Sequence, residues 1–446
     1  MVAHAARVEA GAPFVLRPVV ASDRIGGGYT PDDGRQPVSE LCSRAGGLVC
    51  VNGDFFNCPT CGQPAGGVVD RGRPLRSFRP DHEQVSILDG QLTTDPIWWV
   101  GRLTGVIGND RFDLTLDSLN RGPMPNGAVL YSPEWGPATP QLEGQLEVVL
   151  AAGGPLNPGV THVVPVGRRP VSGGIPGDGV VVSANGAAAD ALNWLVDAWA
   201  STQGPRQLEL HTALSSPVDL SIGGHPVLLR NGERQPPDPN DPMAARRNPR
   251  TLLGWTRTGD LLLVTIDGRR SGYSDGATLD EATELLLELG ADGAINLDGG
   301  GSTTFALRCG TGACVANRPS DGRERPVPLA LALVPSAPEA PVAHTAALPA
   351  PTPSAPSPAA ATEPTTTTTT APSLPVGATP TTLAVAPVSL AAAPSRVDLA
   401  AGVSTPAENP ETVPLGLSVL GTVLSLTMWA ALAINRRRMK TAQRLQ

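Results

Sequence analysis

One long segment of this chain cannot contribute to a hydrophobic core, which limits how much of the protein can be globular. Residues 336–412 consist mainly of Pro, Ala, Thr and Ser, and they include an uninterrupted threonine run from Thr365 to Thr370. Such a segment buries too little apolar surface to offset the entropy lost on ordering. We therefore expect a disordered, extended stalk here, either O-glycosylated on its hydroxyl groups or unmodified.

The segment after the stalk is predicted to span a membrane. Residues 415–434 contain no charged side chain, and a helix of this length covers the ~30 Å of a bilayer core. The basic tail 435–446 follows at once, whereas acidic residues precede the segment. The positive-inside rule therefore places the C-terminus in the cytoplasm.

This orientation predicts a single-pass protein of the cell membrane, with residues 1–335 as an extracytoplasmic domain. Residues 1–14 show no basic region followed by an apolar core, so they do not resemble a secretory signal. We therefore expect an N-terminal signal to be missing from the sequence in hand. The alternative is tail anchoring, with the large domain in the cytosol.

Composition narrows the class of residues 1–335. Gly and Pro together account for 97 of the 446 residues (50 and 47), which excludes a helical bundle or coiled coil. The chain has 33 basic and 41 acidic residues and a net charge of -8. Without a global positive field, nucleic acid is not an expected partner.

The six cysteines fall in close pairs, namely Cys42 with Cys50, Cys58 with Cys61, and Cys309 with Cys314. An even number with local partners is typical of disulfides in an oxidising compartment. The alternative is a four-thiolate zinc site made by the second and third pairs.

Apolar patterns predict several elements in the globular part. Residues 260–266 and 294–298 read as buried strands, and the helix between them begins with the capping-box spacing of Thr278 and Glu281. Residues 47–52 read as a further strand and residues 185–201 as a second helix. Because strand, helix and strand alternate, we predict an α+β fold: one domain with a mixed sheet and packed helices, followed by the stalk and one transmembrane helix.

Two polar clusters follow directly on apolar strands, where sheets commonly bind ligands. The first is Asn52-Gly53-Asp54, and the second runs from Asn296 through Asp298 and three glycines, Gly299 to Gly301, to Ser302. Glycines beside a carboxylate allow backbone N–H groups to approach an anion or a sugar. The alternative is a tight hairpin in which the Asp bonds its own turn.

The sequence lacks the motifs of several other kinds of catalytic or binding site. The glycine-rich run is not a phosphate-binding P-loop, because the only lysine of the chain is Lys440. A serine-hydrolase elbow and a His-Glu-x-x-His zinc pair are missing too. The histidines, including His82 and His225, are expected to be solvated or satisfied. The sequence requires no cofactor and leaves a divalent cation open.

Several motifs together resemble the phosphodiester glycosidase family. They are Asn248-Pro-Arg-Thr-Leu-Leu-Gly254, Gly293-Ala-Ile-Asn-Leu-Asp-Gly-Gly-Gly-Ser-Thr-Thr-Phe305, Val51-Asn-Gly-Asp-Phe-Phe56 and Val315-Ala-Asn-Arg-Pro-Ser320. The resemblance covers residues 45–335 and is densest in the last 90. It implies hydrolysis of a sugar-1-phosphodiester, N-acetylglucosamine-like, at the anomeric C–O bond, on cell-surface glycans.

The resemblance also implies roles for particular residues. Arg250 would hold the phosphate, and Asp298 and Asp54 would activate water or stabilise an oxocarbenium-like sugar. The expected substrate-binding residues are Asn52, Thr251, Asn296, Gly299, Gly300, Gly301, Ser302 and Asn317. A rival hypothesis is a membrane-tethered, non-catalytic carbohydrate-binding module, which the same polar clusters could serve.

Overall fold

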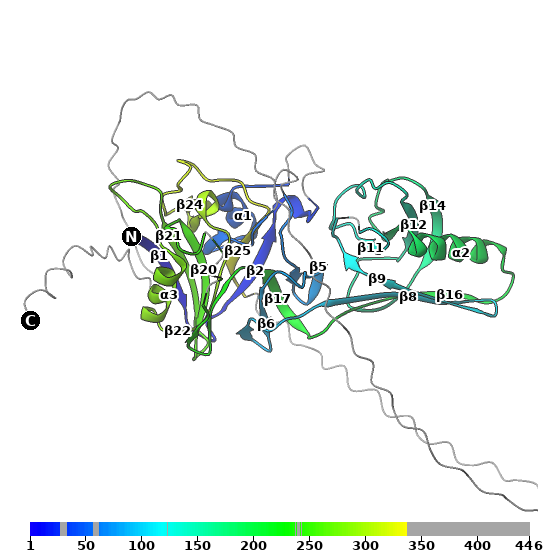
Figure 1. The fold of residues 1–446 in the computed structure, drawn as a ribbon, viewed down its shortest axis with the longest axis horizontal. Helices are drawn as coiled ribbons and strands as arrows, with labels where there is room; N and C mark the ends of the chain where they lie inside the picture. The colour runs from blue at the N-terminus through cyan, green and yellow to red at the C-terminus, as the bar shows by residue number, and fades with distance from the viewer. Residues whose placement is uncertain are drawn as a thin grey trace, which may run out of the picture. The chain divides into compact units, whose positions relative to one another are not determined.

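The structure is a computed structural model that describes residues 1–26, 34–56, 62–122, 124–236, 238, 241 and 243–336 (Figure 1). Apart from Ser336, the predicted stalk 336–412, the transmembrane segment 415–434 and the tail 435–446 lie outside the described residues. Within the described ranges, no helix combines the length and the apolar character needed to cross a bilayer.

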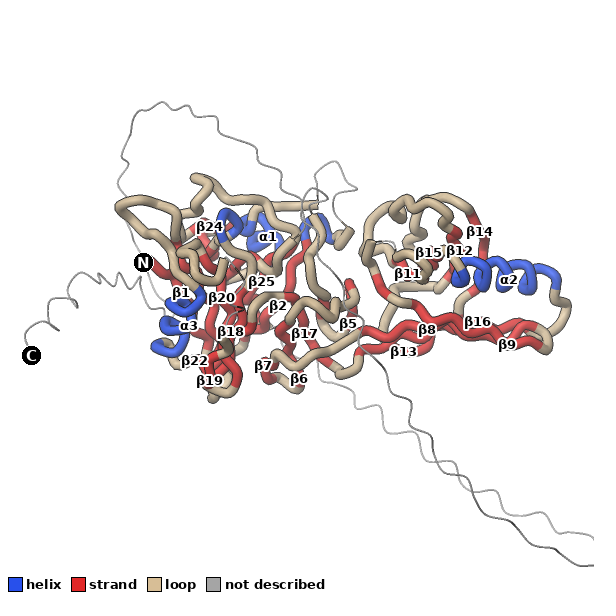
Figure 2. Tube along the Cα trace, in the orientation of Figure 1, coloured by secondary structure: helices blue, strands red, loops and turns tan. Residues whose placement is uncertain are grey.

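The predicted α+β class with packed helices is wrong, because strands predominate in the described part of the chain (Figure 2). Its three α-helices are α1 (Val38–Ala45), α2 (Ala187–Ser201) and α3 (Leu279–Glu288). All strand pairings described are antiparallel except the two-residue β10–β11 pair, so the sheets are not of the mixed type predicted. Twelve of the 25 described strands have five residues or fewer, which leaves little length in which to read a period, and many strands pair with segments far away along the chain.

Two sheets position the predicted site. Sheet A has the strand order β1 (Val2–Val8), β21 (Leu261–Asp267), β20 (Arg250–Thr256), β22 (Ala291–Asn296), β18 (Val227–Arg230) and β19 (Glu233–Arg234). Sheet B has the order β2 (Phe14–Val20), β25 (Leu329–Pro335), β3 (Val49–Asn52), β23 (Phe305–Cys309) and β24 (Gly312–Val315).

Three further sheets complete the described part. One has the order β5 (Arg73–Arg76), β4 (Val68–Asp70), β17 (Val218–Gly223), β6 (Gln84–Leu88) and β7 (Gln91–Thr93). Another has β13 (Gly159–His162), β16 (Arg206–Leu214), β8 (Trp99–Ile107) and β9 (Asp110–Leu116). The last has β10 (Ser118–Leu119), β11 (Ala128–Tyr131), β15 (Gly179–Ala184), β12 (Leu146–Ala151) and β14 (Val164–Arg169). Two short 3₁₀ turns, η1 (Ala21–Asp23) and η2 (Gly300–Ser302), are also described.

Clusters of buried apolar side chains hold sheets A and B against each other and against two helices. Leu253, Leu263 and Ile295 of sheet A share one buried cluster with Val51 and Leu331 of sheet B. The opposite face of sheet A packs on α3, and the opposite face of sheet B packs on α1. The helices are therefore thin outer layers, whereas apolar burial between the sheets forms the central core.

The unit from β21 to β22 shows why the sequence suggested an α/β arrangement. β21 and β22 run parallel to one another and α3 connects them, as expected for a strand–helix–strand unit. However, β20 lies between the two strands and is antiparallel to both. The local elements were predicted correctly, but the pairing partner comes from outside the unit.

The start of α3 matches the predicted capping box. Thr278 Oγ1 accepts a hydrogen bond from Glu281 N (3.1 Å), and Glu281 Oε2 accepts one from Thr278 N (3.2 Å). We expect Thr278→Ala to lower the free energy of unfolding by about 1 kcal/mol, because the Glu281 N–H in the first turn loses its side-chain acceptor. Chemical denaturation of the full chain measures this. Thr278→Ser keeps the hydroxyl group and is the control; an equal loss in both variants would contradict the interpretation.

Two of the predicted disulfides are confirmed, Cys42–Cys50 and Cys309–Cys314. The first joins α1 to β3, and the second closes the β23–β24 hairpin. Cys58 and Cys61 lie outside the described residues. Because Cys309 and Cys314 are oxidised, they do not supply the two thiolates that the alternative zinc site required.

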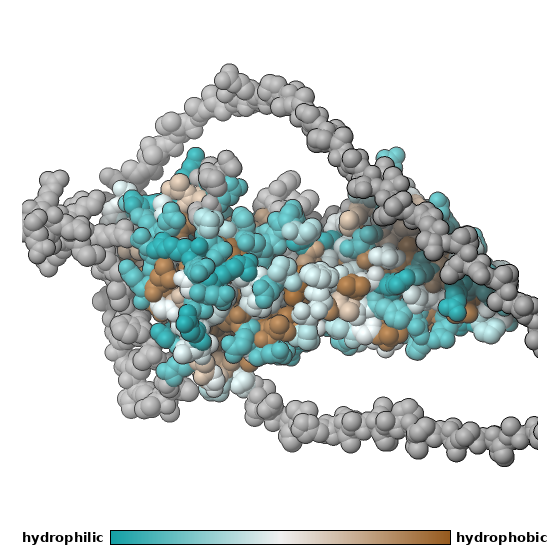
Figure 3. Space-filling model, turned by 60° about the horizontal axis from the view of Figure 1, so that its bottom comes forward, coloured by the Kyte–Doolittle hydropathy of each residue, from teal (hydrophilic) through white to brown (hydrophobic). Residues whose placement is uncertain are grey.

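Apolar side chains are also present on the surface of the described part. Figure 3 shows hydrophobic residues interspersed with hydrophilic ones over the visible face. Exposed examples include Trp98 and Val100 near the start of β8 and Val160 in β13. Scattered residues of this kind are normal for a folded domain.

Candidate functional site

Most of the predicted site residues gather at one end of sheet A. Asn296 ends β22, and Arg250 begins the antiparallel neighbour β20, so the two lie near the same edge. A pocket of about 470 Å³ opens there. The predicted residues that line it are Arg250, Asn296, Asp298, Gly299, Gly300 and Gly301.

Asp298 is the carboxyl group at this edge whose pKa departs most clearly from its ordinary value. The residue is partly exposed in the pocket wall, but protein surrounds its carboxyl group, and this desolvation raises the pKa of Asp298 to about 6. Ser302, the Gly299 N–H and Arg325 act in the opposite direction, while the nearby Asp54 raises the pKa slightly further. A carboxyl group with a pKa near neutrality is suited to proton transfer.

Asn52, at the end of β3 in sheet B, binds the backbone of Asp298. Its Nδ2 donates to the Asp298 carbonyl oxygen (2.6 Å), and its Oδ1 accepts from Thr251 Oγ1 (2.7 Å) and Thr304 N (3.2 Å). Both Asn52 and Thr251 are fully buried. The structure therefore places these two predicted substrate-binding residues behind the pocket wall, where they join β3, β20 and the Asp298 loop.

The glycine-rich loop uses most of its own N–H groups. Gly299 N donates to Asp298 Oδ1 (2.9 Å), Gly300 N to Pro249 O (3.0 Å) and Ser302 N to Gly299 O (3.2 Å). These groups are therefore not free to form the anion cradle expected from the sequence. Gly300 has φ +62°, a conformation that favours glycine.

Arg250 supplies the buried positive charge of the pocket. It donates through Nε to Ala277 O (3.1 Å) and through Nη2 to Met243 O (2.7 Å) and Arg246 O (3.0 Å). Burial lowers the pKa of Arg250 to about 10, with a further decrease from Arg269 and an opposing increase from Asp241. The guanidinium group still carries its charge at neutral pH.

Two further arginines, Arg269 and Arg325, line the same pocket. Arg269 donates through Nε and Nη2 to Asn248 Oδ1 (3.2 and 3.0 Å), and Arg325 donates through the same atoms to Asp321 Oδ2 (2.9 and 2.7 Å). A Cβ atom at Gly301 would lie 2.0 Å from Arg325 Nη2. The glycine therefore leaves the space in which Arg325 reaches the pocket.

Asp54 is close to the site but does not line the pocket. Its side chain is buried, and its two oxygens accept hydrogen bonds from Phe55 N (2.8 Å), Gly66 N (2.6 Å) and His82 Nε2 (2.7 Å). The ring of Phe55, which does line the pocket, meets His82 edge to face. Asp54 thus acts on the pocket through its charge and through the residues it holds.

Ser302 and Asn317 are also buried outside the pocket lining. Ser302 Oγ has no hydrogen bond of normal geometry, although it lies near enough to Asp298 to lower the pKa of that carboxyl group. Asn317 Nδ2 donates to Asp267 Oδ1 (2.9 Å) and Thr303 O (3.1 Å), and its Oδ1 accepts from Phe305 N (2.8 Å). Asn317 therefore supports the end of the glycine loop.

Sequence reasoning did not assign Arg269, Arg325 or His225 to the site, although all three line the pocket. Arg269 follows the end of β21 by two residues, so its position after an apolar strand was an available signal. His225 was expected to be solvated or satisfied, but it lines the pocket beside Asn296. No sequence signal marked it, because its neighbour on β22 is 71 residues away.

The described residues contain no group of three or more His, Cys, Asp or Glu side chains arranged to hold a metal ion. The pocket instead combines arginines with Asp298 and Asp241. Its donor set suits an anionic organic ligand.

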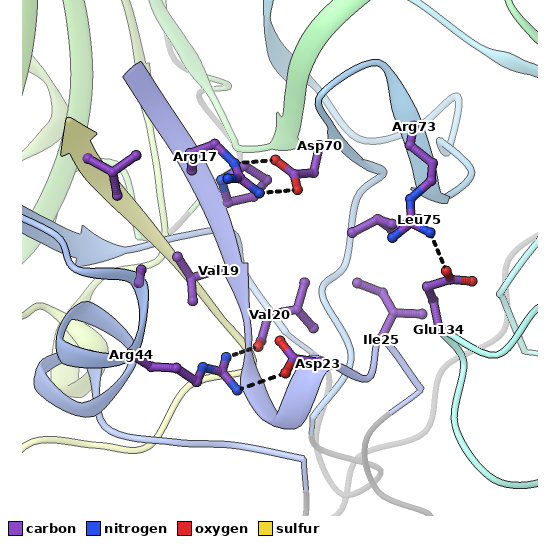
Figure 4. A pocket seen from close by; sticks show the side chains of 13 residues that line it. Arg17, Val19, Val20, Asp23, Ile25, Arg44, Asp70, Arg73, Leu75 and Glu134 are labelled. Carbon is purple, nitrogen blue, oxygen red and sulfur yellow. Dashed lines mark hydrogen bonds and ion pairs between the residues drawn. The ribbon is translucent and has the colours of Figure 1, made fainter. Parts of the chain in front are cut away.

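A second cavity of about 300 Å³ is lined by charged side chains that already have partners (Figure 4). Arg17 pairs with Asp70, and Arg73 Nη1 lies 2.6 Å from Glu134 Oε1. Arg44 lies 3.4 Å from Asp23 (Nη1 to Oδ2). Because these charges neutralise one another, and because none of the predicted site residues is present, we do not assign the chemistry to this cavity.

The comparison with protein families agrees with the motifs. Residues 152–334 match the family model described as phosphodiester glycosidase. This range contains Arg250, Asn296 and Asp298, and the resemblance inferred from the motifs is confirmed over these residues.

Individual relatives match over a shorter stretch. The N-acetylglucosamine-1-phosphodiester alpha-N-acetylglucosaminidase of Bos taurus is 46% identical over 72 residues, which are 16% of this chain and 12% of the relative. The Homo sapiens protein of the same name is also 46% identical over 72 residues, covering 16% of this chain and 13% of the relative. The chain thus matches only about an eighth of the length of these curated relatives.

Two crystal structures share the fold. A putative exported protein from Burkholderia pseudomallei has a TM-score of 0.56 at 22% identity, covering 74% of this chain and 73% of that chain. A hypothetical protein from Synechocystis has a TM-score of 0.54 at 22% identity, covering 73% of this chain and 57% of that chain. At this identity the likeness concerns the fold alone.

Proposed function

We propose that this protein hydrolyses a sugar-1-phosphodiester at the anomeric C–O bond, releasing a free sugar and a phosphomonoester. The observation that carries the proposal is that Asp298, a carboxyl group with a raised pKa, lines the same pocket as Arg250, Arg269 and Arg325. The pocket thus pairs a group able to exchange protons with cations able to hold a phosphate. The family match and the named activity of the curated relatives support this reaction class.

The arginines are assigned to the phosphate. Arg250 is oriented by three backbone carbonyls, which leaves its Nη1 without a protein partner in the described structure. When the C–O bond breaks, negative charge accumulates on the departing phosphate oxygens, and fixed guanidinium groups stabilise it without reorganising.

Asn296 is assigned to the sugar. Its Nδ2 is committed to His225 O (2.7 Å), whereas its Oδ1 is buried in the pocket wall without a partner. A buried acceptor without a donor is costly. A sugar hydroxyl or an acetamido N–H, as in N-acetylglucosamine, would satisfy it.

Asp298 is assigned to the reacting carbon, where it stabilises the oxocarbenium-like sugar or exchanges a proton. Asp54 is assigned an indirect role, because its buried charge helps to raise the pKa of Asp298. We place the reaction outside the cytoplasm, on cell-surface glycans, since the two disulfides of the described part are typical of oxidising compartments.

The direct test incubates the full chain, purified under oxidising conditions, with the methyl phosphodiester of N-acetylglucosamine-1-phosphate. Hydrolysis at the anomeric bond yields free N-acetylglucosamine and methyl phosphate in equal amounts. Binding of the diester without release of either product would favour the rival carbohydrate-binding module. Release of methanol and sugar phosphate instead would mean that the P–O bond of the methyl ester is cleaved.

Gly301→Ala tests the assignment of Arg325. The new methyl group would lie 2.0 Å from Arg325 Nη2 and 2.2 Å from Asp321 Oδ2, so this flexible ion pair must move. We expect KM for the diester to rise by about 5- to 10-fold, equivalent to roughly 1 kcal/mol, because a charge-assisted contact is weakened. Steady-state kinetics measures the change. Gly167→Ala is the control, because Gly167 lies outside the pocket and its added methyl group would meet nothing within 4 Å; an equal effect there would contradict the assignment.

A further inference from the structure

The pocket lacks a second acid–base group at the position where the sequence suggested one. Cleavage of a glycosidic C–O bond by water commonly uses two groups, one acting on the water and one acting on the developing charge or the leaving group. Asp298 lines the pocket, but both oxygens of Asp54 are occupied by protein donors and its side chain is buried. Another residue of the pocket must therefore share the work with Asp298.

His225 has the geometry for this role. Its Nδ1 lies 3.0 Å from Glu83 Oε2, and the same carboxylate oxygen accepts a hydrogen bond from Val227 N (2.8 Å). His225 Nε2 has no protein partner in the described structure, and the half-exposed ring lines the pocket. A carboxylate that binds Nδ1–H fixes the tautomer in which Nε2 is a proton acceptor.

The backbone around the imidazole is fixed on both sides. His225 N donates to Asn296 O (2.8 Å), and Asn296 Nδ2 donates back to His225 O (2.7 Å). Gly224 N donates to Glu83 O (3.0 Å), so the residue next to His225 is tied to the residue that orients its ring. The imidazole is thus placed beside the end of β22, two residues before Asp298.

We propose that His225, oriented by Glu83, is the general base that deprotonates the attacking water, an inference that rests on the proposed function. The water oxygen forms a bond with the anomeric carbon, and its proton passes to His225 Nε2. The C1–O bond to phosphate breaks, its electron pair leaves with the phosphomonoester, and the arginines hold the product. Asp298 stabilises the positive charge that develops on the sugar ring. Glu83 is a positioning residue, since it acts through His225.

The charges around His225 determine the expected pH dependence. Glu83, hydrogen-bonded to the ring, raises the pKa of His225, burial opposes this, and Asp241 and Asp238 raise it further. Asp298 and Arg250 line the same pocket as the ring. A general base must be neutral to accept a proton. We therefore expect kcat/KM to increase as the pH rises through the pKa of His225, which lies above the ordinary histidine value of about 6.5.

The test compares the full-length wild type with His225→Asn and Glu83→Gln, using the N-acetylglucosamine-1-phosphate methyl diester at a series of pH values. His225→Asn should reduce kcat by about 100-fold or more with a much smaller change in KM, and added imidazole should restore part of the rate. Glu83→Gln should move the acidic limb of the pH profile to lower pH, because the group that raises the pKa of His225 is removed. Should His225→Asn fail to fold, the shift in Glu83→Gln carries the test.

The matched control is His211→Asn, since His211 also pairs with a glutamate, Glu209, but lies on β16 outside the pocket. It should leave kcat and the pH profile unchanged. A His225→Asn enzyme that keeps wild-type kcat, or a Glu83→Gln enzyme with an unshifted acidic limb, overturns the proposal while the proposed function stands. A wild type that releases no sugar from the diester overturns both.

Discussion

Asp298→Asn is expected to reduce kcat for sugar release by about 1,000-fold, within the range usual for the loss of a group that acts on the reacting atoms. The amide retains an oxygen that can accept the Gly299 N–H bond (2.9 Å) but carries no negative charge. The positive charge that develops on the sugar ring then loses the carboxylate that stabilises it. Because the arginines are untouched, affinity for methyl phosphate should change by less than about 3-fold. Free sugar is measured by product assay and product affinity by calorimetry.

The control for this substitution is Asp280→Asn, which removes an exposed carboxylate on the first turn of α3. It should have wild-type kcat. If Asp298→Asn also retained most of its activity, Asp298 would not act on the reacting atoms. If neither variant nor the wild type released sugar while all three bound the diester, the binding-module hypothesis would replace the hydrolase.

Arg250→Lys is expected to have the second-largest effect, on binding and on stability together. Lysine places a single ammonium group where the guanidinium reaches three carbonyls, Ala277 O, Met243 O and Arg246 O. We expect KM to rise at least about 10-fold, because the planar fork that matches a phosphate is lost. The free energy of unfolding should fall by about 2 kcal/mol, because buried carbonyls lose charged partners. Steady-state kinetics and chemical denaturation measure the two effects.

Arg257→Lys is the matched control, since Arg257 is an exposed arginine that pairs with Asp292 at the far end of the same strand region. An exposed pair of this kind contributes less than about 1 kcal/mol, so neither KM nor stability should change much. Equal behaviour of the two variants would contradict the assignment of Arg250 to the phosphate.

The sequence predicted the elements that carry their own local signals. The capping box of Thr278 and Glu281 and the apolar stripe after it defined α3 to within a residue at its start. The apolar run 260–266 predicted β21 (Leu261–Asp267) to within one residue at each end. Such signals depend on residues close along the chain, and therefore survive without knowledge of the fold.

The fold class was wrong because it depends on strand pairing. The β21–α3–β22 unit suggested an α/β arrangement, but β20 inserts between its strands, and β1, from the N-terminus, pairs with β21. Pairing of this kind joins residues as far apart as Val2 and Asp267. No local period encodes which partner a short strand finds.

The candidate site also contains residues whose place could be predicted from the sequence and residues whose role only the fold decides. The Asp298–Gly299–Gly300–Gly301 run and Arg250 were recognised from residue type and from their position at strand ends, and all of them line one pocket. Asn52, by contrast, is of a type that binds sugars, yet its amide is used to join β3, β20 and the Asp298 loop. Residue type indicates what a side chain can bind, whereas the neighbours that surround it in the fold determine what it does bind.

The sequence by itself therefore determined the family resemblance, the two described disulfides, and the residues that end the strands of sheet A. Only the tertiary structure decided that sheets dominate, that Asp54 is enclosed while Asp298 faces the pocket, and that Glu83 and His225 meet beside Asn296. The physical reason is that burial and electrostatic environment are properties of space. Residues 142 positions apart, such as Glu83 and His225, acquire a shared chemistry only when packing brings their atoms within hydrogen-bond distance.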